Sequence, residues 1–193
     1  MTTTAGLVLA AGEGRRFGGP KAPYLWDGER LVDRAVRVLR TGGADPVVVV
    51  LGAWDGDVPG ATTVMNTEWA SGMGSSLRAG LHALTDLDGV LRVAVTLVDL
   101  PGLTSAAVRR VLAGAAGGQD LVQAGYDGVP GHPVVLGRSH WAGVAATATG
   151  DSGARDYLER HEVSLVEVGD LATGTDLDLP PPDPQHPPLA GWN

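Results

Sequence analysis

The sequence predicts a three-layer α/β/α sandwich built on a mostly parallel sheet. Short runs rich in β-branched residues alternate with stretches of helical periodicity, as in chains whose helices connect parallel strands. The longest of these runs are apolar throughout, which is typical of strands covered by helices on both faces. With 193 residues, the chain is long enough for one such domain but not for two.

Seven runs are expected to form the strands. Residues 5–11 (AGLVLAA) are apolar on both faces, which predicts a central strand. Residues 46–52 (PVVVVLG) and 93–98 (VAVTLV) predict two more buried strands, and Pro101 prevents the latter from pairing further. The other strands are expected at 62–65, 121–124, 134–136 and 163–168.

Four segments have the spacing of helices, with apolar residues three or four positions apart. The first is expected to end at Gly42 and Gly43, because glycine readily terminates a helix. The second is expected over residues 73–84. The residues predicted to share one side of each helix are Leu31, Ala35, Val36 and Leu39; Leu77, Leu81 and Leu84, which are expected to face inward; Val108, Val111, Leu112 and Ala115; and Ala154, Tyr157, Leu158 and His161.

The last residues of the chain differ from the rest in composition. Residues 180–193 (PPPDPQHPPLAGWN) contain too much proline for a regular element, because proline cannot donate a backbone hydrogen bond. We therefore expect a single domain over residues 1–179, followed by a proline-rich tail that is disordered or lies along the surface.

Composition excludes several classes of function. A net charge of −8 argues against a nucleic-acid or membrane partner, since both favour basic surfaces. The absence of cysteine excludes disulfides, iron–sulfur clusters and thiolate zinc sites. The chain begins without the basic segment of a signal peptide, and no apolar run approaches the ~20 residues of a membrane-spanning helix. These features predict a cytoplasmic protein.

The segment after the first expected strand has the composition of a phosphate-binding loop. Open α/β sheets bind ligands at the carboxyl ends of their strands, and residues 9–21 (LAAGEGRRFGGPK) lie at such an end. Glycines let backbone amides approach an anion, and basic side chains supply the positive charge that a triphosphate requires. These residues are Gly12, Gly14, Gly18 and Gly19, with Arg15, Arg16 and Lys21.

Two familiar phosphate loops do not match this segment. A P-loop requires Lys-Ser or Lys-Thr after its last glycine, and neither occurs here. A dinucleotide-binding GxGxxG is also excluded, because Phe17 occupies the place of the third glycine. A glycine-rich turn with solvent-facing arginines is the remaining alternative.

The loop is the first of six segments that occur in a fixed order. They are 9–21, 66–81 (NTEWASGMGSSLRAGL), 98–104 (VDLPGLT), 130–136 (PGHPVVL), 150–155 (GDSGAR) and 170–180 (DLATGTDLDLP). Together they resemble the molybdopterin-type nucleotidyltransferases, a family that also includes sugar-phosphate and methylerythritol-phosphate transferases. The resemblance runs from Gly6 to about Asp178 and implies a Rossmann-like, mostly parallel sheet of the nucleotide-diphospho-sugar transferase type. The LAAG, WxxGMxxSL and GDxGAR patterns are most similar to the cytidylyltransferase branch, whereas the guanylyltransferase branch more often carries LAGG.

Asp99 ends an expected strand, so its carboxylate should point into the crevice where ligands bind. The resemblance implies that Asp99 holds a catalytic Mg²⁺ ion, or Mn²⁺, since such ions take carboxylate and phosphate oxygens. It also implies a second acidic ligand at Asp176 or Asp178, which strand alternation would place on one face. The alternatives are a turn or helix-capping role for Asp99 and exposed loop positions for the other two.

Small residues before the second expected helix are candidates for recognising phosphate or base, because hydroxyls and free amides gather at helix starts. Ser71 or Ser75 could instead cap the helix, and Trp69 could belong to the core or cover the nucleotide. The expected nucleotide-binding residues are Leu9, Ala10, Ala11, Gly12, Glu13, Gly14, Arg15, Gly18, Lys21, Asn66, Ser71, Gly72, Met73, Ser75 and Ser76.

Three further residues, His132, Asp151 and Arg155, are expected to position the substrate. His132 could instead be a turn residue, and Asp151 is expected to cap the helix that follows it. The GDSG of residues 150–153 also occurs in trypsin-like proteases, but the alternation of strands and helices excludes that fold.

The resemblance implies nucleotidyl transfer by in-line displacement at the α-phosphorus of a nucleoside triphosphate, with CTP favoured. The terminal phosphate of molybdopterin would attack and pyrophosphate would leave, with Lys21, Arg16 and Asp99 as the catalytic residues. Alternatives are GTP as the donor, or a sugar or alcohol phosphate as the acceptor. Another is a non-catalytic chaperone that binds nucleotide and delivers the cofactor to a molybdoenzyme partner.

Overall fold

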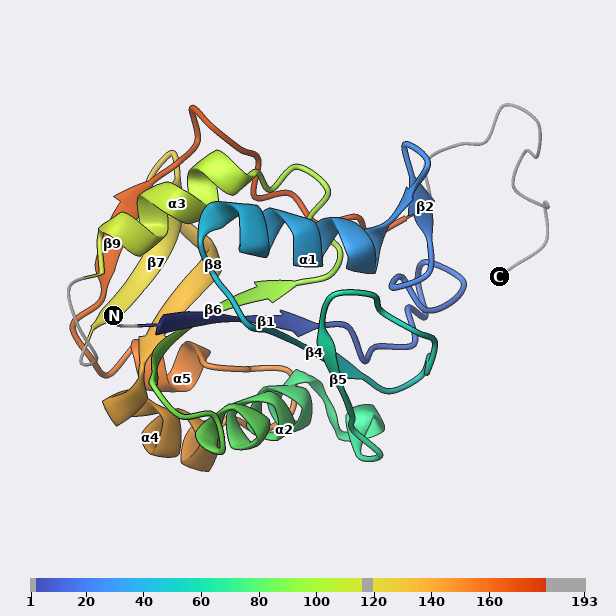
Figure 1. The fold of residues 1–193 in the computed structure, drawn as a ribbon, viewed down its shortest axis with the longest axis horizontal. Coiled ribbons are helices and arrows are strands. Elements are labelled where there is room, and N and C mark those ends of the chain that lie inside the picture. The colour runs from blue at the N-terminus through green and yellow to red at the C-terminus, as the bar shows by residue number, and fades with distance from the viewer. Residues whose placement is uncertain (1–2, 116–119, 180–193) are drawn as a thin grey trace.

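The computed structural model describes residues 3–115 and 120–179, and these form the three layers that the sequence predicts (Figure 1). A central sheet lies between two layers of helices. The expected proline-rich tail, residues 180–193, lies outside the described residues.

Seven strands form the sheet, and six of them run in the same direction. Their order is β5 (Thr62–Met65), β4 (Val47–Leu51), β1 (Thr3–Leu9), β6 (Val90–Leu97), β8 (Val129–Gly137), β7 (Leu121–Tyr126) and β9 (Ser164–Glu167). Within this sheet, β8 runs antiparallel to both of its neighbours. β1 is buried between β4 and β6, which confirms the prediction of a central strand. A separate hairpin of β2 (Leu25–Trp26) and β3 (Glu29–Arg30) follows the glycine-rich loop.

The helices divide between the two faces of the sheet (Figure 1). One face carries α1 (Leu31–Gly42) and α3 (Ser105–Ala113); the other carries α2 (Met73–Thr85), α4 (Trp141–Thr147) and α5 (Arg155–Leu158). α1 ends as predicted, because Gly43 adopts the left-handed conformation at a φ of 102°. None of the described helices is long and apolar enough to cross a bilayer.

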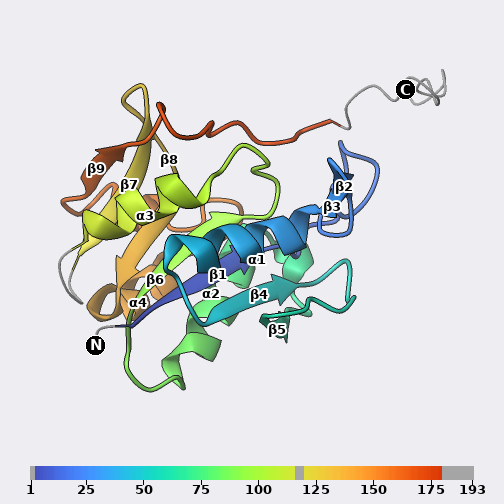
Figure 2. The same cartoon turned by 45° about the horizontal axis from the view of Figure 1, so that its top comes forward.

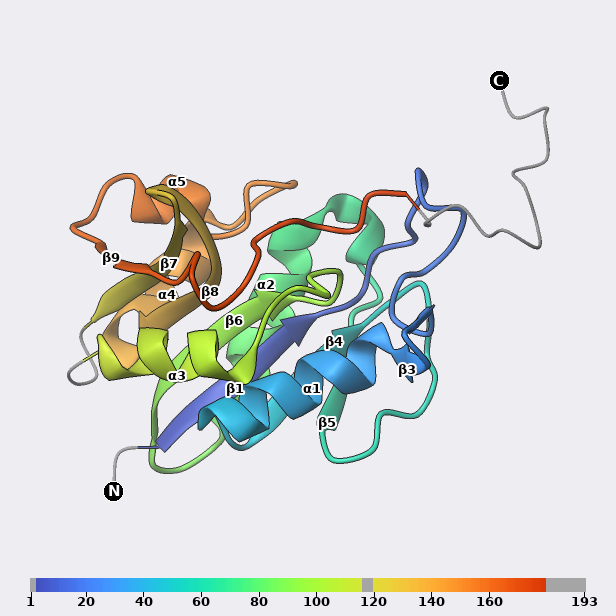
Figure 3. The ribbon, with the colours of Figure 1, turned by 90° about the horizontal axis from the view of Figure 1, so that it is seen from above.

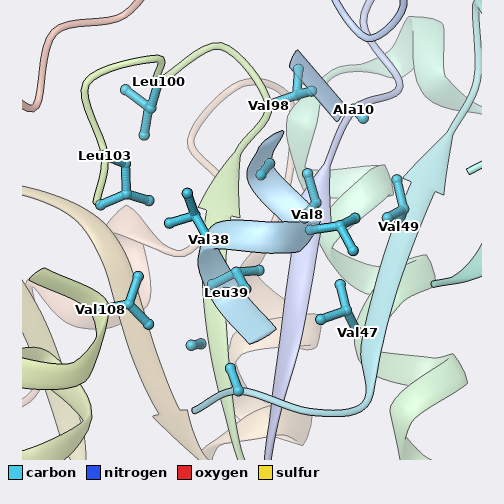
Figure 4. Close-up of a cluster of buried hydrophobic side chains, with 14 of the residues drawn as sticks. Val8, Ala10, Val38, Leu39, Val47, Val49, Val98, Leu100, Leu103 and Val108 are labelled. Atoms are coloured by element: carbon cyan, nitrogen blue, oxygen red, sulfur yellow. The ribbon is translucent and has the colours of Figure 1, made fainter. Parts of the chain in front are cut away.

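Apolar side chains fill the space on both sides of the sheet. Figure 4 shows the cluster under α1, where Val38 and Leu39 of the helix lie close to Val8 of β1. The leucines predicted for the inner side of α2 are buried in a second cluster on the opposite face. Because β1 and β6 pair in parallel, their carboxyl ends lie side by side at one edge of the sheet.

Three elements depart from the expectations. The helix predicted around Ala154 and His161 is only the four-residue α5. Neither α4 nor the hairpin of β2 and β3 was predicted. In α4 the sequence WAGVAAT offers only Trp141 and Val144 as large buried residues, so its periodicity is too short to recognise.

Candidate active site

Two cavities lie side by side at the carboxyl ends of β1 and β6. The first cavity has a volume of about 410 Å³ and is lined by the glycine-rich loop, the start of α2 and Asp99. The second cavity, of about 690 Å³, is lined by β7, β8, α5 and part of the segment after β9. Both contain Leu9, Met73 and Leu97 in their walls, so a ligand in one would adjoin a ligand in the other.

The glycine-rich loop folds around the carbonyl oxygen of Gly14. This oxygen accepts hydrogen bonds from the amides of Phe17, Gly18 and Gly19 at 2.9, 2.9 and 3.2 Å. Phe17 is buried and meets Tyr24 edge-on, with ring centroids 4.8 Å apart. The loop is therefore anchored by an internal turn and by one aromatic side chain.

The backbone amides just before this turn have no acceptor within residues 3–115 and 120–179. The amides of residues 12–16 donate no hydrogen bond to the described part of the chain, and residues 12–15 line the first cavity. Consecutive amides of this kind form concave sites that bind phosphate. The loop thus presents the donors that a polyphosphate requires.

Gly14 is essential to this shape. Its φ is +63°, and a Cβ added there would lie 2.0 Å from the carbonyl oxygen of Gly19. We expect Gly14→Ala to lower the free energy of unfolding by at least about 1–2 kcal/mol and to weaken nucleotide binding. Gly19→Ala is the matched control, because a Cβ there meets nothing within 4 Å. Calorimetric Tm and nucleotide titration check both variants; wild-type values for Gly14→Ala would contradict the prediction.

Lys21 and Asp99 form an ion pair within the first cavity. Lys21 Nζ donates to Asp99 Oδ2 across 2.7 Å, and each side chain is 16% exposed. The pair joins the segment that follows β1 to the residue that follows β6, so the structure brings together two of the three predicted catalytic residues. Lys21 is also the only lysine in the chain.

The two loop arginines are more exposed. Arg15 lines the first cavity and forms an ion pair with Glu13. Arg16, the third predicted catalytic residue, does not line the cavity. Its side chain is 77% exposed and pairs with Asp178, with Nη2 and Oδ1 3.0 Å apart.

α2 begins in the wall of the first cavity. Its N-cap is Gly72, with a φ of 110°, and neither Ser71 nor Ser75 caps it. The amide of Met73 instead donates to Asp151 Oδ1 at 3.4 Å. The expectation that Asp151 caps the helix after it is wrong, because α5 has no side-chain cap. The segment around Asp151 packs against the start of α2, and this contact brings the carboxylate to that helix.

Asn66 stabilises the start of α2 from behind the wall of the first cavity. It is 6% exposed, and Nδ2 donates to the hydroxyls of Ser75 and Ser76 at 2.8 and 3.1 Å. Oδ1 accepts from the amide of Glu68 at 2.9 Å. Of these residues, Ser76 lines the first cavity whereas Asn66 and Ser75 line neither cavity. Asn66 therefore lies behind the cavity wall.

This network should contribute measurably to stability. We expect Asn66→Ala to lower the free energy of unfolding by about 1–3 kcal/mol, because it leaves buried polar groups without partners. Ser71→Ala is the control, since the hydroxyl of Ser71 is exposed and bonds to one carbonyl oxygen. Urea denaturation measures both variants. A loss for Asn66→Ala no larger than that for Ser71→Ala would contradict the assignment.

The three carboxylates expected near a metal lie in different surroundings. Asp99 lines the first cavity, Asp176 lines the second, and Asp178 pairs with Arg16. Strand alternation does not place Asp176 and Asp178 on one face, because residues 170–179 form no strand. Across residues 3–115 and 120–179, no three acidic or histidine side chains are grouped to hold a metal ion. Of the three expected ligands, Asp99 thus lines the first cavity, whose wall also includes Glu13 and Asp151.

Two of the three expected positioning residues line the second cavity. His132 lies on β8, with its Nδ1 3.2 Å from the carbonyl oxygen of Val95. Burial lowers the pKa of His132, although that hydrogen bond and the charge of Asp99 oppose the shift. A neutral ring that donates from Nδ1 keeps Nε2 as an acceptor. Arg155, at the start of α5, supplies a cation to the same cavity, whereas Asp151 lines the first.

The second cavity also contains polar residues that the sequence did not predict as site residues. They include Gln123 of β7, Glu159 and His161. His161 stacks on Tyr157, with centroids 3.9 Å apart, and its Nδ1 lies 2.7 Å from the carbonyl oxygen of Tyr157. The four-residue spacing of this pair predicts only that both residues share one side of a helix, and it does not indicate a cavity.

Most of the expected nucleotide-binding residues line the first cavity. They are Leu9, Ala10, Ala11, Gly12, Glu13, Gly14, Arg15, Lys21, Gly72, Met73 and Ser76. Gly18, Asn66, Ser71 and Ser75 do not line it. Trp69 lines the cavity while packing against Gly52, where an added Cβ would lie 2.7 Å from the tryptophan Cβ. Trp69 therefore belongs to the wall.

Comparison with known sequences identifies the family to which this architecture belongs. The sequence profile of the MobA-like NTP transferase domain matches residues 6–165. The chain belongs to the MobA-like NTP transferase domain family. The matched region contains the glycine-rich loop, Lys21 and Asp99, and it ends within β9.

Relatives of this MobA-like chain have different names. Nicotine blue oxidoreductase of Paenarthrobacter nicotinovorans is 38% identical over 194 residues, which cover 92% of this chain and 93% of that protein. A probable molybdenum cofactor guanylyltransferase of Opitutus terrae is 40% identical over 103 residues, which cover 53% of this chain and 50% of that protein. Similar sequences therefore carry both transferase and oxidoreductase names.

Solved structures confirm the fold of the MobA-like domain. The homologue of Rv0371c from Mycobacterium sp. strain JC1 superposes with a TM-score of 0.75 at 27% identity, covering 91% of this chain and 90% of that one. Rv0371c of Mycobacterium tuberculosis has also been solved in complex with manganese; that structure has a TM-score of 0.68 at 23% identity and covers 86% of this chain and 89% of that one.

Proposed function

We propose that the protein transfers a nucleotidyl group from a nucleoside triphosphate in the first cavity to a phosphorylated acceptor in the second. The observation that carries this proposal is the row of amides in residues 12–15, which have no acceptor among the described residues and belong to a cavity that also contains the Lys21–Asp99 pair. The amides would bind the phosphates, and Lys21 would offset the negative charge that grows as pyrophosphate leaves. Arg16 would reach the phosphates from its exposed position in the glycine-rich loop.

The acceptor phosphate needs little activation. It is already an anion, so positioning beside the α-phosphorus and electrostatic stabilisation are sufficient, and no general base is required. The shared wall of the two cavities supports such an arrangement. In the second cavity, His132, Arg155 and the neighbouring polar groups would hold the acceptor.

A divalent cation fits the donor set of the first cavity. Mg²⁺ is commonly held by one or two carboxylates together with substrate phosphates, so Asp99 alone is a sufficient protein contribution. Mg²⁺ or Mn²⁺ held there would neutralise phosphate charge. Asp176 and Asp178 would take part only if residues 174–178 changed position.

CTP and molybdopterin are the first substrate pair to test. The LAAG form of the loop supports CTP, whereas the relative named as a guanylyltransferase supports GTP as the alternative. Pyrophosphate release would be measured with each of the four triphosphates, with Mg²⁺ or Mn²⁺, and with molybdopterin present or omitted. Release that requires molybdopterin supports the proposal. Tight triphosphate binding without release would instead support a nucleotide-binding chaperone that serves a molybdoenzyme.

A redox function is the second candidate, and one specific observation favours it. Nicotine blue oxidoreductase matches this chain over 93% of its own length. The same amides could hold the pyrophosphate of a nicotinamide dinucleotide. The second cavity, with walls that include Leu77, Val134 and Leu136, could then hold a flat apolar acceptor next to the nicotinamide.

One parallel assay separates the two candidates. The protein would be mixed with NADH or NADPH and nicotine blue, and the loss of nicotinamide absorbance would be followed. Oxidation of the reduced dinucleotide with no pyrophosphate release from any triphosphate would replace the transferase proposal. Pyrophosphate release with no dinucleotide oxidation would exclude the redox candidate.

A further inference from the structure

Residues 170–178, which we call the strap, run from the end of β9 to the glycine-rich loop. Figures 2 and 3 show this segment passing the carboxyl end of β6 and reaching the loop that follows β1. The strap lies after the region matched by the family, which ends at residue 165. It forms neither helix nor strand, so its position depends on individual contacts.

The near half of the strap, residues 170–173, is attached by several close contacts. The amide of Thr173 donates to the carbonyl oxygen of Gly102 at 3.2 Å, and the hydroxyl of Thr104 donates to that of Leu171 at 3.0 Å. A Cβ added at Gly102 would lie 1.8 Å from Thr173 Oγ1, so the two segments touch closely. This half is therefore fixed to the loop between β6 and α3.

The far half, residues 174–178, is held by much less. Its only main-chain hydrogen bond to the described chain runs from the amide of Leu177 to the carbonyl oxygen of Asp99, at 2.9 Å. The second polar attachment is a two-pronged ion pair, in which Arg16 donates to both oxygens of Asp178 at 3.0 and 3.3 Å. Besides the packing of Leu177 on the core and of Gly174 on Tyr126, one backbone hydrogen bond and one ion pair thus hold the end of the strap against the site.

The far half of the strap adjoins both cavities. Leu177 is bonded to the backbone of Asp99, whose side chain lines the first cavity. Gly174 and Asp176 line the second cavity. A displacement of these five residues would therefore remove part of one wall of the second cavity.

We propose that Asp178 competes with the triphosphate for Arg16, so that nucleotide binding in the first cavity releases residues 174–178 and opens the second cavity. The inference rests on the proposed nucleotide site. Arg16 is the last residue of the row of loop amides that have no acceptor in the described chain, so phosphate bound there would attract its guanidinium. Asp178 would then lose its partner, and the far half would keep only the Leu177 hydrogen bond and the packing of Leu177 and Gly174.

The expected effect is modest because the ion pair is exposed. The side chains of Arg16 and Asp178 are 77% and 47% exposed, and pairs of this kind are screened by water and salt. Removing the competing carboxylate should tighten nucleotide binding by about two- to fivefold. A metal-ligand role for Asp178 predicts the opposite sign, because loss of the carboxylate would then weaken binding of the metal–nucleotide complex.

The first experiment compares Asp178→Asn with a matched variant on the same segment. Asp170 also forms an exposed ion pair, with Arg110 of α3, but it contacts neither cavity. Titration calorimetry with non-hydrolysable CTP and GTP analogues and Mg²⁺ would measure affinity in wild type, Asp178→Asn and Asp170→Asn. We expect tighter binding in Asp178→Asn only. Unchanged or weaker binding in that variant would overturn the inference.

The second experiment measures directly whether the far half of the strap stays attached. Hydrogen exchange of the Leu177 amide reports whether its bond to Asp99 is intact. We expect the bound analogue to speed exchange at Leu177 while it slows exchange in residues 12–16, and we expect Asp178→Asn to speed exchange at Leu177 without nucleotide. Slower exchange at Leu177 on nucleotide binding would show that the strap closes, which contradicts the inference. If the wild type bound no triphosphate, the proposed nucleotide site itself would fail and the inference with it.

Discussion

Replacing Lys21 by methionine is expected to lower the rate of pyrophosphate release by about 10²–10³-fold, the usual cost of losing one charged contact to a transition state. The ammonium group lies in the first cavity, 2.7 Å from Asp99 Oδ2. Methionine has a stem of similar length, so the substitution removes the charge and leaves the volume of the wall nearly unchanged. The loss should appear mainly in kcat, because the negative charge that Lys21 offsets grows during the reaction.

Arg40→Met provides the matched control for this variant. Arg40 also pairs with an aspartate, at 3.1 Å from Asp45, but it is half exposed and lies in neither cavity. Its loss changes the net charge equally and should leave turnover unaltered. Both variants should unfold in a single transition near the wild-type Tm. Turnover by Lys21→Met within threefold of wild type would contradict a catalytic role for this lysine.

Asp99→Asn is expected to cause a loss of similar size, about 10²–10³-fold, together with a need for more Mg²⁺ or Mn²⁺. The amide keeps the shape of the carboxylate but lacks the charge that attracts a divalent cation. It also leaves Lys21 without its anionic partner in a site where each side chain is only 16% exposed. Rates measured across a range of metal concentrations separate the metal effect from a general loss of activity.

A double-variant cycle tests whether Lys21 and Asp99 act together. Residues that serve one step lose less in combination than the sum of their separate losses. Lys21→Met with Asp99→Asn should therefore be little slower than the worse single variant. Asp45→Asn, which breaks the exposed Arg40 pair, is the control for removal of a carboxylate. Full additivity of the two losses would show that the pair does not work as a unit.

The layers of the fold could be predicted from sequence because burial imposes regular patterns. The valine-rich run of β4 and the apolar run of β1 are buried along their whole length, as their composition requires. The three leucines of α2 recur at helical spacing because that helix packs one face on the sheet. The weaker elements lacked such patterns, as the seven residues of α4 and the four of α5 show.

The first cavity could be predicted in part for a different reason. The glycine-rich loop and Asp99 follow adjacent strands, so the topology brings them together once both strands are recognised. The position of the Asp151 carboxylate could not be predicted in this way. This carboxylate caps α2, which begins 78 positions earlier, and nothing local to residues 149–152 indicates that contact. Asn66 likewise looked like a ligand contact in sequence, but its three hydrogen bonds are made within the protein.

The second cavity was the least predictable part. Its walls come from strands β7 and β8, from α5 and from the strap, and each contributes only one or a few polar groups. Gln123 and Glu159 belong to no recognisable motif, so only the folded arrangement shows that they share a cavity. The tautomer of His132 is set by the carbonyl of Val95 on the neighbouring strand, a partner 37 residues away.

Because Lys21 is the sole lysine, amine chemistry can address the first cavity of the unmodified protein selectively. Periodate-oxidised nucleotides carry a dialdehyde that condenses with amines, and borohydride fixes the product. Besides the α-amino group, the ε-amine of Lys21 is the one place where such a reagent could attach. The mass of the labelled peptide, and its suppression by an excess of each triphosphate in turn, would rank the bases without any knowledge of the acceptor.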